Sequence, residues 1–151
     1  MSAKEDIRKT IAQFANSFDL NDWSLLESSL ANALTVDYTD LRENPPKEMT
    51  AHEYAQNQRK ALEGLYTQHI IGNLEIAVDE QRAKVRASGV IFRASNDASF
   101  NTHARFLFGL LVDQDRGWVI DRIEQTVLWS EGNPDIQSEV KKQRTPRKLG
   151  F

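Results

Sequence analysis

The chain of 151 residues contains no cysteine, which excludes disulfide bonds, thiolate catalysis and cysteine-ligated zinc. It also lacks any apolar run near the roughly 20 residues that a membrane-spanning helix needs. Its first six residues have no apolar stretch of the kind found in a secretory signal. Because the net charge is only −3, nothing favours a large nucleic-acid-binding surface. We therefore expect a soluble cytoplasmic protein that binds neither nucleic acid nor membrane.

Several common catalytic signatures are missing as well. The sequence has no phosphate-binding glycine loop, no HExxH zinc motif and no GxSxG turn. Nucleotide-driven, zinc-peptidase and serine-hydrolase chemistry therefore lose their usual support. What is present is an ordinary globular composition, with 40% hydrophobic and 27% charged residues, in a length that suits one domain.

The first part of the chain has the spacing of helices. Apolar residues recur along one stripe from Ile7 to Phe18, which predicts an amphipathic first helix. Asn21 or Asp22 can cap a second helix that runs through Trp23, Leu26 and Leu30. A third helix is predicted to begin at Thr50, because residues 50–53 (TAHE) form a capping box. The prolines of residues 44–46 (NPP) separate it from what precedes.

The second part of the chain has the character of strands. A first strand is predicted at residues 34–38, and four longer ones at 67–78, 83–93, 101–112 and 118–128. The spacers between the long strands are short and polar, which favours an antiparallel meander. Helices followed by strands predict an α+β domain over residues 1–133, with helices against a strongly curved sheet that leaves a pocket at its open end.

Residues 134–151 differ from this domain because they are basic and broken by proline. We interpret them as a solvated C-terminal tail. A contact of this tail with nucleic acid or an anionic membrane has weak support, since no aromatic residue is interleaved with the charges.

His69 is the most informative residue, since the chain has only three histidines and this one lies within an apolar strand pattern. Imidazole can gain or lose a proton near neutral pH, which makes an acid–base role possible. A hydrogen-bonded structural histidine is the other interpretation. Alternation along the strand places His69, Ile71 and Asn73 on one face. It places Ile70, Leu74, Ile76 and Val78 on the other, which we interpret as packing.

Other candidates have structural alternatives of their own. Asp19 follows the first helix, where it could serve as a turn or capping carboxylate. Tyr38 ends a strand and could be a core residue with its hydroxyl at the surface. His103 lies near the start of its strand, where an exposed rim is the simpler placement, and His52 should be solvated. The small residues Ala87 and Gly89 could leave room for a ligand or allow close packing.

The chain resembles the scytalone dehydratase family, within the SnoaL-like group of the nuclear transport factor 2-like superfamily. The resemblance spans roughly residues 5–133 and is carried by short segments in the same order, namely residues 18–26 (FDLNDWSLL), 34–38 (LTVDY) and 67–72 (TQHIIG), with Trp118 and Trp129. It implies a cone-shaped α+β fold around a pocket, with neither a metal nor an organic cofactor. It also implies a homo-oligomer, a dimer or trimer, paired through the outer sheet face with Phe106, Phe108 and Trp129 as its apolar surface.

The resemblance assigns the catalytic roles to His69, Asp19 and Tyr38. Asp19 would orient His69, His69 would accept the proton α to a ketone, and Tyr38 would polarise the carbonyl or a bound water. The positions expected to contact the ligand are Phe18, Trp23, Ile71, Asn73, His103 and Leu107.

The sequence departs from that family at three positions. Phe18 replaces a tyrosine, no histidine lies near Ala94, and Leu107 stands near the position of a pocket asparagine. The leading hypothesis is a cofactor-free lyase or isomerase acting on a small hydrophobic, cyclic or polyketide-like ketone through a His69–Asp19 pair. The alternative is a non-catalytic module of the same fold that binds a small molecule or a protein. Hydrogen-bond contact between Asp19 and His69 inside a closed cavity would favour the enzyme, and side chains that point to different faces would favour the binding module.

Overall fold

A computed structural model describes residues 2–38 and 45–136 of the chain. The predicted break at Asn44 and most of the predicted tail, from residue 137 onward, lie outside the described residues. The elements, in chain order, are α1 (Ala3–Asp19), α2 (Trp23–Ser28), β1 (Leu30–Asp37), β2 (Lys47–Thr50), α4 (Ala51–Ala61), β3 (Tyr66–Asp79), β4 (Arg82–Ala94), β5 (Ser99–Asp113) and β6 (Gly117–Gly132).

The helices begin where capping side chains occur in the sequence. The Asp22 carboxylate accepts from the Leu25 amide at the start of α2, and the Thr50 hydroxyl accepts from the Glu53 amide at the start of α4. Both caps satisfy amides that a helix leaves without an internal partner. The prediction that α2 runs through Leu30 is wrong, since α2 ends at Ser28 and Leu30 begins β1. The short edge strand β2 has no counterpart in the sequence prediction.

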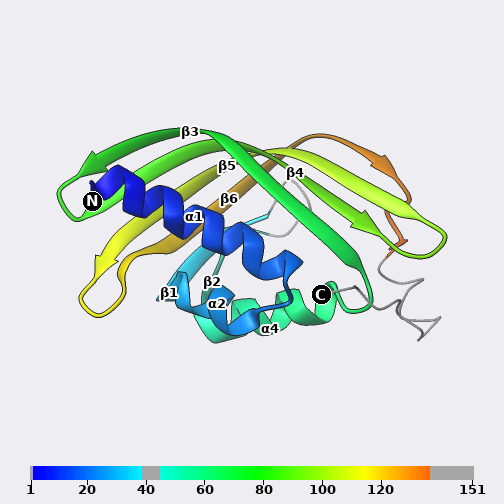
Figure 1. The fold of residues 1–151 in the computed structure, drawn as a ribbon, viewed down its shortest axis with the longest axis horizontal. Coiled ribbons are helices and arrows are strands. Elements are labelled where there is room, and N and C mark those ends of the chain that lie inside the picture. Colours follow the sequence, from blue (N-terminus) through cyan, green and yellow to red (C-terminus); the bar gives the residue numbers. More distant parts are fainter. Residues whose placement is uncertain (1, 39–44, 137–151) are drawn as a thin grey trace.

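Within the described residues, six strands form one sheet in the order β2-β1-β6-β5-β4-β3. The four long strands pair as an antiparallel meander, as predicted, whereas β1 pairs with β6 in parallel. The sheet curves over α1, which lies against its concave face, and α2 and α4 lie beneath one end (Figure 1). The predicted α+β class with helices on a strongly curved sheet is confirmed.

Alternation along the strands separates a buried concave face from a convex outer face. Side chains such as Val85, Ala87, Phe106 and Phe108 point into the core with α1. The prediction that Phe106 and Phe108 offer outer apolar surface is therefore wrong. Their neighbours Arg105 and Leu107 occupy the outer face of β5, where they are at least partly exposed.

A bulge in β3 corrects the predicted faces of that strand. The β3–β4 register shifts between Gly72 and Glu75, and Asn73 adopts a left-handed φ of 53°. Because one extra residue inverts the alternation, Leu74 and Ile76 pack against the core while Ile70 remains 53% exposed. Leu74 and Ile76 thus share a face with Ile71, and the predicted grouping of Ile70 with them is wrong.

Candidate active site

Asp19 and His69, fifty residues apart in the sequence, meet where the end of α1 lies against β3. Asp19 Oδ1 lies 2.8 Å from His69 Nδ1, and its two oxygens accept the His69 backbone N–H at 3.0 and 2.8 Å. The side chains are 7% exposed for His69 and 19% for Asp19. A third donor group, the Thr67 hydroxyl, makes a longer bond to the same carboxylate at 3.4 Å. One carboxylate therefore fixes both the main chain and the ring of His69.

This hydrogen bonding sets which ring nitrogen is available for chemistry. An ionised carboxylate can only accept, so His69 Nδ1 carries the proton that faces Asp19. In the neutral ring, Nε2 then holds the lone pair, which is the form of a general base. The arrangement is that of a histidine whose ring is oriented by an aspartate, and the two side chains are within hydrogen-bond distance.

Phe18 holds the ring of His69 from the other side. The two rings stack with centroids 4.4 Å apart and planes inclined by 18°. Trp23 packs edge-on against Phe18 at 6.2 Å but does not line the pocket. Phe18, which stands where the family has a tyrosine, thus restricts the orientation of the imidazole by stacking but has no hydroxyl group to donate a hydrogen bond.

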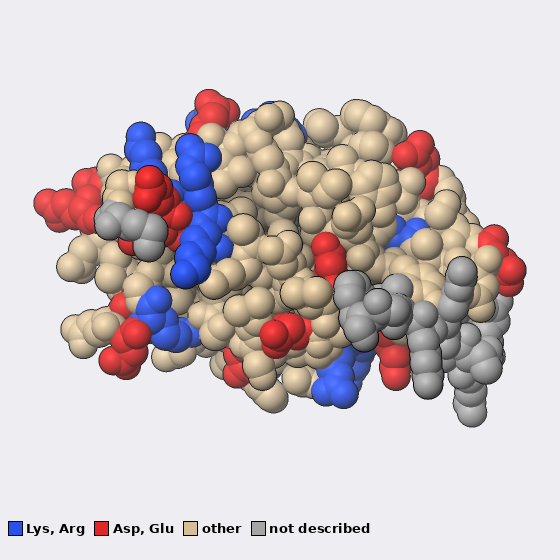
Figure 2. Space-filling model, in the orientation of Figure 1, with Lys and Arg blue, Asp and Glu red and all other residues tan. Residues whose placement is uncertain are grey.

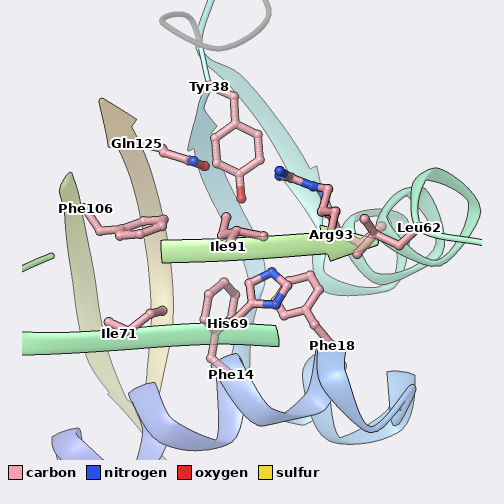
Figure 3. A pocket seen from close by; sticks show the side chains of 11 residues that line it. Phe14, Phe18, Tyr38, Leu62, His69, Ile71, Ile91, Arg93, Phe106 and Gln125 are labelled. Atoms are coloured by element: carbon pink, nitrogen blue, oxygen red, sulfur yellow. The ribbon is translucent and has the colours of Figure 1, made fainter. Parts of the chain in front are cut away.

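His69 lines a small pocket on the concave side of the sheet, with a cavity volume of about 40 Å³ within about 480 Å³ of empty space that includes open solvent. Ile91 and Phe106 lie between His69 and the opposite wall, and Phe14 and Phe18 project from α1 (Figure 3). The full lining comprises Phe14, Phe18, Tyr38, Gln58, Leu62, His69, Ile71, Ile91, Arg93, Phe106 and Gln125. The expected ligand positions Phe18 and Ile71 thus lie in the pocket, together with His69 and Tyr38, while Asp19 lies directly behind His69.

The wall opposite His69 is polar and carries Tyr38, Arg93 and Gln125 (Figure 3). The Tyr38 hydroxyl is hydrogen-bonded to the hydroxyl of Tyr54, which is buried. The Arg93 guanidinium donates to Thr102 Oγ1 at 2.9 Å, which anchors it from β5. A tyrosine pair and a positioned cation therefore face the histidine across the pocket.

The sequence interpretation did not identify Arg93 and Gln125, although alternation contains a signal for both. Arg93 continues the inward series of Val85, Ala87 and Ile91 on β4, and Gln125 follows Ile123 on the inner face of β6. A polar residue at an inward position of a strand has no packing reason to be there. That pattern marks both positions as candidates.

The structure does not bring Asn73, His103 and Leu107 to this pocket. Asn73 and His103 line a separate hollow on the outer face, and Leu107 lies on the outer side of β5. His103 stacks on Trp129 with ring centroids 4.1 Å apart, and its Nε2 donates to Glu131 at 3.0 Å. That bond, with a second from Asn101, lowers the pKa of the Glu131 carboxyl. Asn73 was expected in the pocket from strand alternation that takes no account of the β3 bulge, and Leu107 because the resemblance places a pocket asparagine near it.

Two kinds of feature are absent from the described part of the chain. Among residues 2–38 and 45–136, no cluster of three or more histidine, aspartate or glutamate side chains is placed to hold a metal ion. None of the helices in those ranges is both long and apolar enough to cross a bilayer.

Solved structures share this fold at low sequence identity. A protein from Kribbella flavida superposes with a TM-score of 0.83 at 17% identity, over 91% of this chain and 97% of that one. A proposed scytalone dehydratase from Novosphingobium aromaticivorans gives 0.66 at 16%, over 83% of each chain. A type 2 hexachlorocyclohexane dehydrochlorinase gives 0.70 at 12%, over 87% and 88%.

Identities this low establish the fold and not the activity. No curated protein matches the sequence. The pattern of the SnoaL-like domain matches residues 1–124, which is most of the chain. The protein therefore belongs to the SnoaL-like domain family.

Proposed function

We propose that the protein is a cofactor-free lyase or isomerase that moves a proton on a small hydrophobic ketone, with His69 as the base and Asp19 as the residue that orients it. The observation that carries the proposal is the 2.8 Å contact between Asp19 and His69 Nδ1 behind a pocket with an apolar floor. A buried imidazole with one nitrogen committed to a carboxylate has the other available for proton transfer.

The proposed reaction begins with proton abstraction. His69 Nε2 takes a proton from the carbon next to the carbonyl, and the C–H electron pair moves to give an enolate. Where the β-carbon carries a hydroxyl group, the enolate electrons form the carbon–carbon double bond as the C–O bond breaks. The departing oxygen takes the proton from the His69 imidazolium and leaves as water. Where the ketone instead carries a β,γ double bond, proton abstraction gives a dienolate, and return of the proton from His69 to the γ-carbon gives the conjugated isomer.

Tyr38 is placed to assist at the oxygen. Its hydroxyl bonds to Tyr54, and either hydroxyl can be the donor in that pair. When Tyr54 donates, the Tyr38 proton is directed to a substrate carbonyl or to a bound water, where it would stabilise developing negative charge. Two structural neighbours have names that denote eliminations, a dehydratase and a dehydrochlorinase, which supports this class of reaction.

A binding module without catalysis is the second candidate, and one observation favours it. Asp19 accepts the backbone N–H of His69 through both oxygens, which ties α1 to β3 whether or not the ring reacts. In that case the contact would be structural, and the pocket would hold a small hydrophobic molecule unchanged.

Figure 2 bears on the charge of the ligand. On the face that it shows, lysine and arginine gather with acidic neighbours near the N-terminal end of α1, and much of the remaining surface is uncharged. No broad field of one sign covers this face, so the surface shown does not draw a charged ligand from a distance. We also propose that the protein is a homo-oligomer that pairs through the outer face of the sheet.

The test uses the first chemical step and does not require the natural substrate. The α-protons of acetophenone exchange with D₂O, and NMR follows the loss of their signal. We expect the wild type to accelerate this exchange. The exchange rate with His69→Gln should be lower than with the wild type by roughly 100-fold or more, which is the usual contribution of a general base. Thermal unfolding and acetophenone affinity should change little.

His52→Gln is the matched control, because the His52 side chain is 68% exposed and contacts Glu27 far from the pocket lining. It should exchange like the wild type. Equal exchange by His69→Gln and the wild type would refute the mechanism, and binding without any acceleration would favour the binding module.

A further inference from the structure

Gln125 has an unsatisfied hydrogen-bond donor inside the pocket. Its side chain is 5% exposed, and Nε2 has no hydrogen-bond partner among the residues that the structure describes. It lines the same pocket as His69 and points inward from β6 (Figure 3). A buried amide donor without a partner costs free energy, so such groups in folded proteins usually meet a ligand, a water or another residue.

The position of Gln125 makes its polarity unusual. Ile123, two residues earlier on the same inner face of β6, is fully buried, and the register partner of Gln125 on β5 is Phe106. An apolar side chain would pack here without an orphaned group. A glutamine at this position is therefore explained better by a bound molecule than by the stability of the fold.

Gln125 and His69 approach the pocket from opposite sides. They belong to β6 and β3, which are three strand spacings apart in the sheet, roughly 14 Å along its surface. Ile91 on β4 and Phe106 on β5 provide an apolar floor between them. A ligand that lies on this floor would place an acceptor atom at Gln125 and the rest of its body toward His69.

We infer that Gln125 is a specificity-determining residue whose side-chain N–H donates to the carbonyl oxygen of the substrate. The ligand class is a neutral carbonyl compound with an apolar body, and its acidic α-carbon lies toward His69. A neutral amide N–H favours a ligand that has an acceptor oxygen over one that lacks it, and the ligand does not need a charge for this. The function of His69 in this assignment rests on the proposed function, whereas recognition of the oxygen by Gln125 does not.

The experiment compares two probes of the same shape. Acetophenone carries a carbonyl oxygen where α-methylstyrene carries a CH₂ group, so their affinity ratio measures recognition of the oxygen. We expect the wild type to prefer acetophenone and Gln125→Met, which keeps the length of the side chain, to bind acetophenone roughly tenfold more weakly. The affinity for α-methylstyrene should stay within about twofold or improve, since an unpaired donor has been removed.

Two controls accompany this variant. Gln81→Met makes the same replacement in the exposed turn between β3 and β4 and should keep the wild-type preference. Thermal unfolding of Gln125→Met should occur at the wild-type temperature or above it, because the orphaned amide is gone.

The outcomes separate this inference from the proposed function. Loss of the ketone preference in Gln125→Met supports the inference, even if His69→Gln still exchanges protons and the proposed mechanism fails. An unchanged preference in Gln125→Met overturns it, and so does a wild type that binds acetophenone no better than α-methylstyrene. The last result would indicate that a resident water alone satisfies Gln125.

Discussion

At the scale of the residue, Asp19 does two things that an exposed carboxylate at a helix end does not. It accepts from the His69 ring and from the His69 main chain, so that α1, β3 and the candidate base depend on one side chain. We expect Asp19→Asn to reduce proton exchange strongly, because an amide in place of the carboxylate no longer fixes the proton on Nδ1. Chemical denaturation should show a loss of about 1–3 kcal/mol, the usual cost of disturbing a buried hydrogen-bonded group.

Asp22→Asn is the control for this prediction. Asp22 lies three residues away and caps α2 through the Leu25 amide at 3.0 Å, and asparagine caps a helix about as well as aspartate. Stability and exchange should stay near the wild-type values. If Asp19→Asn behaves in the same way, Asp19 does not orient the base.

A second residue-scale prediction concerns Glu131 on the outer face. The hydrogen bond from His103 lowers the pKa of the Glu131 carboxyl, and the bond from Asn101 adds to the effect. A lowered pKa in the folded state stabilises the protein above the ordinary carboxyl range of about 4. That stabilisation disappears as the pH falls through the lowered pKa. A ¹³C NMR titration of Glu131 should place its midpoint below the ordinary value.

In His103→Phe, which retains an aromatic ring against Trp129, the Glu131 midpoint should return toward the ordinary carboxyl value. A midpoint that stays low in this variant would show that His103 is not the main cause.

The site could be predicted from the sequence only in part. Thr67–Gly72 and the segment around Asp19 have the order of a known family, so the pairing of Asp19 with His69 followed from resemblance and not from spacing. Gln125 could not be assigned in this way. A glutamine in a strand indicates a binding site only when its side chain is known to point into a pocket, and the sequence does not show that. Asn73 was misplaced because Gly72 indicates a bend or bulge but does not show that the alternation of the strand inverts at that point.

At the scale of the element, helices were predicted more accurately than strand faces. A helix start depends on local chemistry, and the Thr50 cap occurs where residues 50–53 place it. The face of the sheet on which a strand residue lies depends on the whole strand remaining in register with a partner strand that is remote in sequence. One residue with a left-handed φ in β3 was enough to put Ile70 and Leu74, which were predicted to share a face, on opposite faces of the strand.

Gly89 in β4 illustrates how an element shapes the pocket. A Cβ added at Gly89 would lie 2.6 Å from Cε2 of Phe106, whose ring is stacked on Phe108 at 5.5 Å. The small residue therefore serves close packing beneath the pocket floor, one of the two interpretations left open by the sequence. We expect Gly89→Ala to lower the free energy of unfolding by about 1–3 kcal/mol, as overpacking does. It should also weaken acetophenone binding by displacing the Phe106 ring.

Gly72→Ala is the matched control, because a Cβ at Gly72 meets nothing within 4 Å. Denaturant unfolding and acetophenone titration of the two variants check the prediction. Equal behaviour of both would mean that the Phe106 ring does not depend on Gly89.

At the scale of the whole molecule, the two faces of the sheet differ in what covers them. The concave face is covered by α1 and holds the pocket, whereas the convex face has no helix of the described chain against it (Figure 1). Apolar side chains are nevertheless exposed on that outer face, with Ile70 at 53%, Leu128 at 54% and Trp129 at 55%. Together with Asn73 and His103 they line the outer hollow. Contiguous exposed apolar side chains are typical of an interface.

This surface leads to the last prediction, that Leu128→Lys reduces the molar mass in solution toward that of the 17.2 kDa chain. A charge buried in an interface without a partner is costly, so one substitution should be enough to separate the subunits. Size-exclusion chromatography with light scattering measures the mass. Leu20→Lys is the matched control, because Leu20 is equally exposed, at 55%, but follows α1 on the helical side. If the wild type is already a monomer, or both variants keep its mass, the outer face is not the interface. The pocket, which lies on the other face, should bind acetophenone with unchanged affinity in the Leu128→Lys monomer.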